Sequence, residues 1–115
     1  MTRDLRDSLL DVLDAIAAIE RFTAGVEYES FAANEEKIFA VEKAFEIIGE
    51  AVKNVPQPIR SNYPEIPWKN IAGMRDKLAH QYWNVDVNIL WKAIAEDLPQ
   101  IKSTVVRVLE ELNAD

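Results

Sequence analysis

The sequence predicts an all-α fold, and three observations lead to that prediction. Apolar residues recur at three- and four-residue spacings over several long segments, which is the pattern of amphipathic helices. The chain has only three glycines among its 115 residues, whereas a sandwich or barrel needs many tight turns. Four of its five prolines fall between residues 56 and 67, where they separate helical segments. We therefore expect a four- to five-helix up-and-down bundle.

A single domain over residues 1–115 is expected, because a chain of this length buries one core and is too short for two. It has no cysteine, which excludes disulfides and thiol chemistry. Seven of the first twenty residues are charged, and no apolar run approaches the roughly 18 residues of a membrane span. We expect neither a signal peptide nor a membrane anchor, and therefore a cytoplasmic protein.

The first two helices are expected over residues 3–24 and 34–54. In the first, Thr2 is placed to cap the start and Gly25 to end it. Residues 26–33 connect the two helices and have room for a helical turn. The second helix carries the strongest periodic signal of the chain, the seam of a helix packed on another. The residues of that seam are Ile38, Val41, Phe45, Ile48, Val52 and Val55.

Two further features of the second helix concern its surface. Three glutamates, Glu42, Glu46 and Glu50, lie at four-residue intervals and are expected to form a solvated or salt-bridged line. A carboxylate metal site would need matching ligands from another helix, such as a Glu-x-x-His pair, and the sequence has none. Additional apolar residues widen the stripe, so two sides of this helix are expected to be covered. These residues are Phe39, Ala44, Ile47 and Ala51.

The second half of the chain should hold the remaining helices. The proline-rich segment is expected to be a stiff loop with at most one short turn around residues 59–63. A third helix should span residues 68–82, and a fourth should be capped by Asn84 or Asp86. Pro99 allows a kink or a restart before the last helix. The apolar residues of that last helix are Ile101, Val105, Val108, Leu109 and Leu112.

The net charge of −7 is unevenly distributed along the chain. Residues 1–52 hold 5 basic and 12 acidic side chains, and residues 84–115 hold 3 and 6. Residues 53–83, in contrast, hold 5 basic and 2 acidic side chains, together with the only histidine, His80. One positive segment on an acidic body is compatible with a local anion site and argues against an extended DNA-binding face.

The candidate site is the stretch around that histidine, residues 75–82 (Arg-Asp-Lys-Leu-Ala-His-Gln-Tyr). On a helix, Arg75 and Tyr82 share one face, and Asp76 and His80 share the adjacent one. Arg75 and His80 are about 140° apart, too far to converge on one small group from a straight helix. Either the helix ends near His80, or a second copy completes the site across a dimer axis.

These residue types suit cleavage of a phosphodiester. An arginine holds a phosphate with a bidentate fork and stabilises the charge of a pentacovalent transition state. A histidine transfers protons at neutral pH, and Asp76 is placed one turn before His80 to orient the imidazole. The sequence shows no metal-ligand cluster, so the implied reaction is metal-independent. That favours RNA, whose 2′-hydroxyl can attack the adjacent phosphorus, over DNA.

A structural interpretation of the same residues stands beside the chemical one. A single histidine in a helix is usually a surface or hydrogen-bonded residue, and a cluster of Asp, Lys and Arg is usually a solvated face. The three tryptophans, Trp68, Trp83 and Trp91, are more often core or interface anchors than base-stacking platforms. The residues alone leave both interpretations open.

The spacing Arg75-x4-His80-x-Tyr82 resembles the R-x4-H-x-Y signature of the HepT-like toxins, a family of the HEPN superfamily of small helical proteins. The resemblance covers roughly residues 3–112, and the combination of blocks is more specific than the spacing alone. The further blocks that resemble the family's second helix, the segment before its motif and the start of its last helix are residues 41–51, 66–75 and 97–99.

This resemblance implies a dimerising, HEPN-like helical bundle that acts as a ribonuclease toxin, with two motif copies facing each other in a cleft. Arg75 and His80 match the family's catalytic residues, and Asp76 stands where the family commonly has asparagine or another polar residue. The implied partner is a minimal nucleotidyltransferase antitoxin that silences the toxin by adenylylating the motif tyrosine, here Tyr82. The implied substrate is RNA, for example tRNA or mRNA, and no cofactor, metal or membrane is implied.

Two other functions stay open at this point. One is a non-catalytic nucleotide-binding module that serves as a docking subunit for a nucleotidyltransferase. The other is a purely structural helical dimer. Modification of Tyr82 on co-expression would separate a toxin from a docking subunit, and an Arg75→Ala variant with unchanged RNA turnover would indicate a structural dimer.

Overall fold

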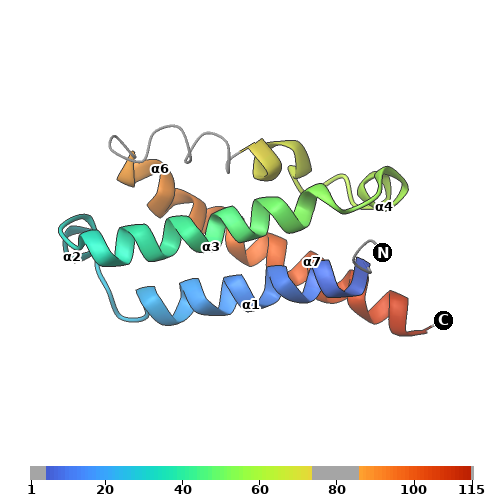
Figure 1. Cartoon of the computed structure of the whole chain (residues 1–115), viewed down its shortest axis with the longest axis horizontal. Coiled ribbons are helices and arrows are strands. Elements are labelled where there is room, and N and C mark those ends of the chain that lie inside the picture. The colour runs from blue at the N-terminus through green and yellow to red at the C-terminus, as the bar shows by residue number, and fades with distance from the viewer. Residues whose placement is uncertain (1–4, 74–85, 115) are drawn as a thin grey trace.

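The computed structural model describes residues 5–73 and 86–114, and every regular element within these ranges is a helix. Helix α1 spans Leu5–Thr23 and α3 spans Glu35–Lys53. Figure 1 shows these two lying side by side along the long axis of the molecule, with the short helix α2 (Tyr28–Ala32) at the turn between them. The prediction of an all-α fold is confirmed.

The remaining elements follow in the second half of the chain. They are α4 (Gln57–Asn62), α6 (Val87–Lys92), the π-helical turn η1 (Ala93–Asp97) and α7 (Leu98–Ala114). Residues 68–73 are helical as well. Helix α7 packs against α1 and lies behind α1 and α3 in Figure 1. None of the described helices combines the length and apolar character needed to span a membrane.

The core lies between α1, α3 and α7. The apolar seam expected over residues 34–54 is confirmed, because five of its six members are buried and the sixth, Ile38, is half-buried. Burial of these side chains is the main favourable contribution to folding. The residues that face this seam from α1 and α7 include Leu9, Val12, Ile16, Ile19, Ile101, Val105 and Val108.

The end of α1 and the start of α3 lie where the sequence predicted. Gly25 has a φ of +69°, in the left-handed region that glycine adopts without a Cβ penalty, and it follows the end of α1 by two residues. Asn34 caps α3, because its side-chain oxygen accepts a hydrogen bond from the backbone N–H of Lys37 at 3.0 Å. Thr2, the expected cap of α1, lies outside the described residues.

The proline-rich segment contains more helix than the single turn expected around residues 59–63. Helix α4 begins earlier because Pro58 occupies its first turn, where a missing N–H costs no helical hydrogen bond. Arg60 then fixes the bend, since Nε donates to the carbonyl of Val55 at 3.0 Å and Nη2 donates to that of Val52 at 2.9 Å. The guanidinium therefore lies at the carbonyl end of α3, where a cation is favourable.

Helix α6 continues into α7 through the π-helical turn η1, so the chain neither breaks nor restarts before Pro99. The backbone N–H of Leu98 donates to the carbonyl of Ala93, five residues earlier. Proline lacks an N–H, and its ring crowds the carbonyl four residues before it. We attribute the wider turn ahead of Pro99 to that crowding, which refines the predicted kink.

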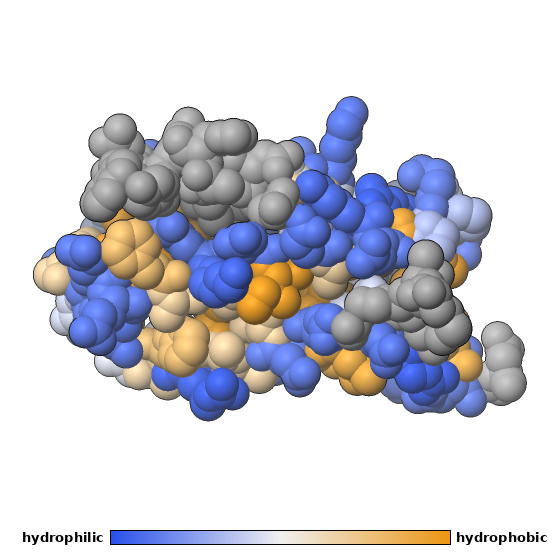
Figure 2. All heavy atoms as spheres, viewed as in Figure 1, coloured by the Kyte–Doolittle hydropathy of each residue, from blue (hydrophilic) through white to orange (hydrophobic). Residues whose placement is uncertain are grey.

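The residues that widen the apolar stripe of α3 are covered only in part. Ala44 and Ala51 are buried, but Phe39 and Ile47 are 38% and 41% exposed. On the face seen in Figure 2, apolar side chains gather over α1 and α3 between the charged ones. The apolar stripe of α3 is thus wider than the surface that α1 and α7 bury.

Candidate functional site

The predicted site residues Arg75, Asp76, His80 and Tyr82 fall within residues 74–85, outside the described part of the chain. Their placement on two helix faces therefore stays a prediction. The structure describes the two borders of this segment and the contacts that hold each border in place.

The border that precedes the motif is anchored by Trp68, which is buried. Its indole Nε1–H donates a hydrogen bond to the carbonyl of Tyr63 at 2.9 Å. The carbonyl of Pro67 accepts the first helical hydrogen bond, from the N–H of Ile71, at 3.0 Å. Ile66 and Ile71 are buried on either side of this start. The helix that begins here therefore has a fixed position against the core.

The border that follows the motif is a capped helix start. The carboxylate of Asp86 accepts hydrogen bonds from the backbone N–H groups of Asn88 at 3.0 Å and Ile89 at 3.3 Å. Asp86 is therefore the N-cap of α6. Of the two caps proposed from the sequence, Asn84 lies outside the described residues.

Tryptophans hold both borders, as the structural interpretation of these residues predicted. Trp91, on α6, packs its ring on Phe31 with the centroids 4.9 Å apart and meets Tyr28 edge-on at 5.9 Å. This contact joins α6 to α2, whereas Trp68 joins the other border to the core. Trp83 lies outside the described residues. In the described part, the tryptophans are anchors and not base-stacking platforms.

Both borders lie on the same side of α3. Figure 1 shows the helical residues 68–73 and the start of α6 on the side of α3 opposite to α1. Helical geometry turns Glu42, Gly49 and Lys53 toward that side, roughly opposite the alanines that line the groove with α1. The chain thus enters and leaves the motif segment over one face of α3.

Glu42 is an ionisable residue that sequence reasoning placed wrongly. It was expected in a solvated or salt-bridged line, but it is only 9% exposed and its Oε1 has no hydrogen-bond partner among the described residues. Burial raises the pKa of this carboxyl above its ordinary value. Each four-residue step turns about 40° around the helix, so Glu46 is half-buried and Glu50 is exposed. Burial of Glu42 could have been predicted from its position on the helix, about 60° from the buried Phe45.

Comparison with known proteins gives the chain a family. The model of the family described as "Ribonuclease HepT-like" matches residues 12–108. This chain belongs to the HepT-like ribonuclease family. The resemblance of the motif and its flanking blocks to that family is thereby confirmed, and no solved structure matches the chain.

Three relatives of this HepT-like chain carry ribonuclease names. "Probable ribonuclease HepT" of Thermococcus cleftensis is 48% identical over 102 residues, which cover 89% of this chain and 93% of that protein. "Putative RNase MJ1216" of Methanocaldococcus jannaschii is 42% identical over 110 residues, covering 96% and 91%. "Putative RNase TTE0752" of Caldanaerobacter subterraneus is 41% identical over 93 residues, covering 81% and 82%.

The groove between α1 and α3 is a pocket of about 470 Å³ in the described surface of this HepT-like protein. Its wall is largely apolar, and its polar side chains are two aspartates and a lysine. That set contains no histidine and no serine, threonine or cysteine. The groove therefore lacks the arginine and histidine that the proposed phosphodiester chemistry uses. The residues that line it are Asp11, Asp14, Ala15, Ala18, Phe22, Ala40, Lys43, Ala44 and Ile47.

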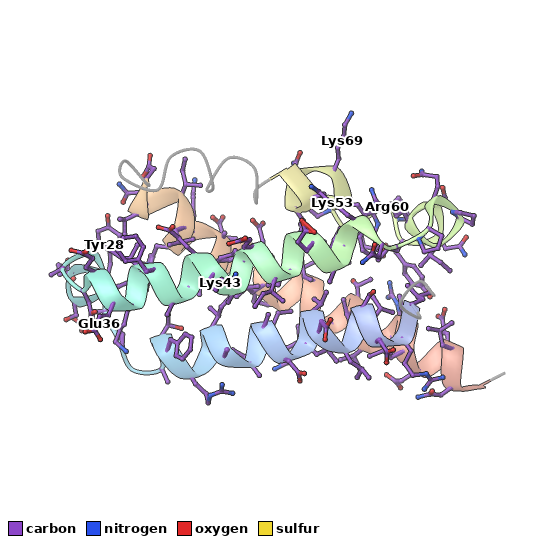
Figure 3. The ribbon with its side chains drawn as sticks, in the orientation of Figure 1. Tyr28, Glu36, Lys43, Lys53, Arg60 and Lys69 are labelled. Atoms are coloured by element: carbon purple, nitrogen blue, oxygen red, sulfur yellow. The ribbon has the colours of Figure 1, made fainter. Side chains whose placement is uncertain are left out.

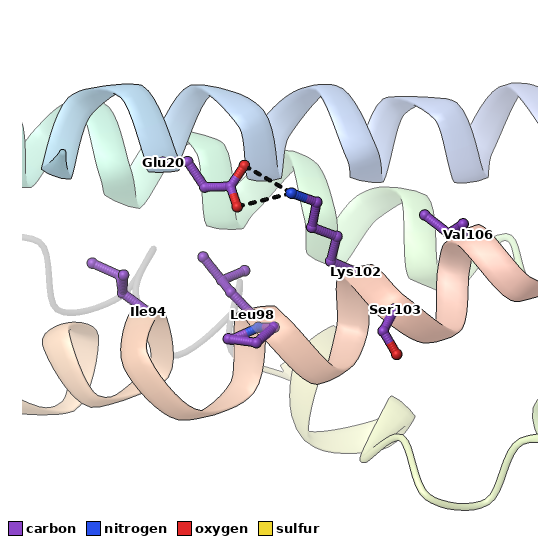
Figure 4. Close-up of a pocket in the computed structure, with 7 residues that line it drawn as sticks. Glu20, Ile94, Leu98, Lys102, Ser103 and Val106 are labelled. Carbon is purple, nitrogen blue, oxygen red and sulfur yellow. Dashed lines mark hydrogen bonds and ion pairs between the residues drawn. The ribbon is translucent and has the colours of Figure 1, made fainter.

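A second pocket, of about 530 Å³, lies between α1 and the start of α7. Figure 4 shows the ion pair that crosses it, in which Lys102 Nζ lies 3.0 and 3.2 Å from the two carboxylate oxygens of Glu20. Ser103 supplies a hydroxyl, but the neighbouring lysine is engaged in this ion pair. The pair links two helices, and the pocket offers no activated nucleophile.

Residues 5–73 and 86–114 contain no group of three or more histidine, aspartate or glutamate side chains placed to hold a metal ion. Within these ranges, the described side chains supply anchors, caps and ion pairs. The residues proposed to carry the chemistry are those of the motif.

Proposed function

We propose that this chain is the toxin of a toxin–antitoxin pair and that it cleaves RNA without a metal ion. The observation that carries the proposal is the Arg75-x4-His80-x-Tyr82 motif in a chain of the HepT-like ribonuclease family. The names of its relatives support RNA as the substrate. We further propose that residues 1–115 form one HEPN-like domain and that the protein is cytoplasmic.

The proposed reaction is a transesterification within the RNA backbone. The 2′-hydroxyl oxygen attacks the adjacent phosphorus, the bond to the 5′ oxygen breaks, and the products carry a 2′,3′-cyclic phosphate and a 5′-hydroxyl. Arg75 holds the non-bridging oxygens and offsets the charge of the transition state. His80 takes the proton from the 2′-hydroxyl or gives one to the leaving 5′ oxygen. Asp76, one turn away, orients the imidazole.

The proposed active unit is a homodimer. On one straight helix Arg75 and His80 point about 140° apart, so a single motif copy does not bring both groups to one phosphate. A second copy that faces the first supplies the missing group. Two motifs in one cleft, as the family resemblance implies, would form two shared sites.

The proposed control is adenylylation of Tyr82 by a minimal nucleotidyltransferase. The phenolic oxygen attacks the α-phosphorus of ATP, the bond to the β-phosphate breaks, and pyrophosphate leaves. Because Tyr82 shares the helix face of Arg75, the added phosphate would attract Arg75 and repel an RNA phosphate. The modification would therefore occupy the site that the substrate needs.

The test is cleavage of RNA, including tRNA, by purified protein in the presence of EDTA. The cleavage position is mapped first, and a matched RNA with one 2′-deoxy substitution at that position is then compared. We expect cleavage to continue in EDTA, to end in a 2′,3′-cyclic phosphate and to stop on the 2′-deoxy substrate. Activity that disappears with the chelator, or that survives the 2′-deoxy substitution, would overturn the mechanism.

A second measurement separates a toxin from a docking subunit that only binds a nucleotide. The chain is co-expressed with the partner nucleotidyltransferase, and its intact mass is measured beside that of Tyr82→Phe. We expect the wild-type chain to gain one AMP and the Tyr82→Phe chain to gain none. A stable complex in which the wild-type mass is unchanged would instead support the docking subunit.

A further inference from the structure

Three basic side chains lie near the first border of the motif segment, and we call them the basic edge: Lys53, Arg60 and Lys69. We propose that the basic edge binds the phosphate backbone of single-stranded RNA outside the cleavage site. This inference rests on the proposed ribonuclease function and deepens it, because it states where the substrate runs beyond the motif.

The charge of this part of the chain is opposite to that of the rest. Residues 53–73 hold three basic side chains and one acidic one, whereas the other 94 residues hold ten basic and nineteen acidic ones. An acidic surface repels RNA, so productive binding is confined to places where the local charge is positive. The basic edge is such a place.

Hydrogen bonds link the neighbours of the three residues along the chain. Arg60 donates to the carbonyl of Val52, the residue before Lys53, at 2.9 Å. The N–H of Tyr63 donates to the carbonyl of Arg60 at 3.1 Å, and the carbonyl of Tyr63 accepts from Trp68, the residue before Lys69. Figure 3 shows the three labelled cations at the same end of α3.

The three cations differ in how they are held. The guanidinium of Arg60 is engaged by the carbonyls at the end of α3, which fixes it in place. Lys53 is exposed on the last turn of α3. Lys69 is exposed, points away from the body in Figure 3, and makes no hydrogen bond or ion pair in the described part of the chain. An exposed lysine without an acidic partner keeps its full attraction for a phosphate.

The one acidic residue of this region is balanced by another cation. Glu65 Oε1 forms an ion pair with Arg107 Nη2 at 2.9 Å. Arg107 also lies over the ring of Tyr63, with its guanidinium carbon 5.1 Å from the ring centroid. Glu65 therefore has a partner other than the basic edge.

The position of the basic edge suits an RNA backbone that extends from the motif. Lys69 lies near the start of the helix that leads toward residues 75–82, and Figure 3 shows Lys53 on the last turn of α3, near that same border. Lysine and arginine side chains that contact phosphates do not distinguish one base from another. We therefore expect the basic edge to raise the affinity for RNA with no sequence preference.

The test uses a His80→Ala background, which prevents cleavage, and a fluorescent single-stranded RNA. Affinity is measured at several salt concentrations for Lys53→Ala, Lys69→Ala and the double variant. Each lost phosphate contact should lower the slope of log K against log salt by about 0.7 and cost about fivefold in affinity at 0.1 M salt. Lys69→Glu should weaken binding further, and Lys69→Arg should restore it.

The matched control is Lys43→Ala, which removes an exposed lysine from the same helix, α3, on the side near the α1 groove. Melting temperatures confirm that every variant is folded. The inference is overturned if Lys69→Glu and Lys43→Ala give the same slope of log K against log salt. It is also overturned if the His80→Ala protein binds an acidic peptide at the basic edge but does not bind RNA. Because binding is measured without cleavage, an inactive wild-type enzyme would contradict the proposed function and leave this comparison intact.

Discussion

Two regions of this HepT-like chain are stabilised in different ways. In α1, α3 and α7, long apolar seams bury one another, and the pockets along them lack the arginine and histidine that the proposed phosphodiester chemistry uses. In residues 53–73 and at Asp86, the chain uses prolines, a helix cap and a tryptophan anchor to hold the borders of the motif. We therefore propose that stability and chemistry depend on separate regions. Variants in one region should therefore change the unfolding free energy, and variants in the other should change the rate of RNA cleavage.

The largest effect is expected in the core of the first region. Phe45→Ala removes a ring that is 3% exposed, and such a cavity typically costs about 3–5 kcal/mol of unfolding free energy. Phe39→Ala on the same helix is the matched control, since Phe39 is 38% exposed. Urea denaturation should show a much smaller loss for that control. Equal losses would mean that Phe39 is covered in solution, for example by another protein.

The next largest effect is expected in the motif. Arg75→Ala should lower the rate of RNA cleavage about 10²–10³-fold, as loss of a transition-state donor does, with the melting temperature unchanged. Arg75→Lys should recover only part of the rate, because lysine lacks the bidentate fork. A rate loss that is accompanied by unfolding would show that the two regions are not separate.

A smaller effect, of opposite sign, is expected at Glu42. Its pKa is raised by burial, so the folded state binds more protons and stability falls as pH rises above the ordinary carboxyl value of 4.5. Glu42→Gln removes this charge and should stabilise the protein at pH 7 by about 1 kcal/mol. Below pH 4.5 the difference should shrink. Thermal unfolding of both proteins from pH 4 to pH 8 tests this, and a less stable variant at pH 7 would show that the charge has a favourable partner.

The smallest effect is expected at the cap of α6. Asp86→Ala removes the acceptor of two backbone N–H groups and should cost about 1 kcal/mol. Asp86→Asn should cost less, because asparagine also caps helices well. Chemical denaturation of the two variants measures the difference. Equal stability of Asp86→Ala and wild type would mean that water replaces the cap.

The long helices could be predicted from the sequence because burial imposes a period of 3.6 residues on it. This argument placed α1, α3 and the seam from Val41 to Val55 correctly. The argument failed where the backbone conformation depends on a single proline and not on the spacing of apolar residues. The extra length of α4 and the π-helical turn depend on how Pro58 and Pro99 fit into their turns.

The candidate site was predicted from residue chemistry and family resemblance, not from periodicity. Arg75, His80 and Tyr82 indicate a phosphate clamp, a proton-transfer group and a modifiable hydroxyl, and the family match supports a ribonuclease. Burial of Glu42 could not be predicted from its spacing to the other glutamates, because a four-residue step leaves the buried face. The hydrogen bonds from Arg60 to Val52 and from Trp68 to Tyr63 depend on how the chain bends after α3, so only the fold reveals them.

The most direct test of the central claim uses two inactive variants. Arg75→Ala and His80→Ala chains with different tags are co-expressed, and the mixed dimer is purified and assayed on RNA in EDTA. We predict that each parent dimer is inactive and that the mixed dimer, which has one intact shared site of two, regains about half of the wild-type rate. A parent dimer with wild-type activity, or a mixed dimer as inactive as its parents, would contradict the account.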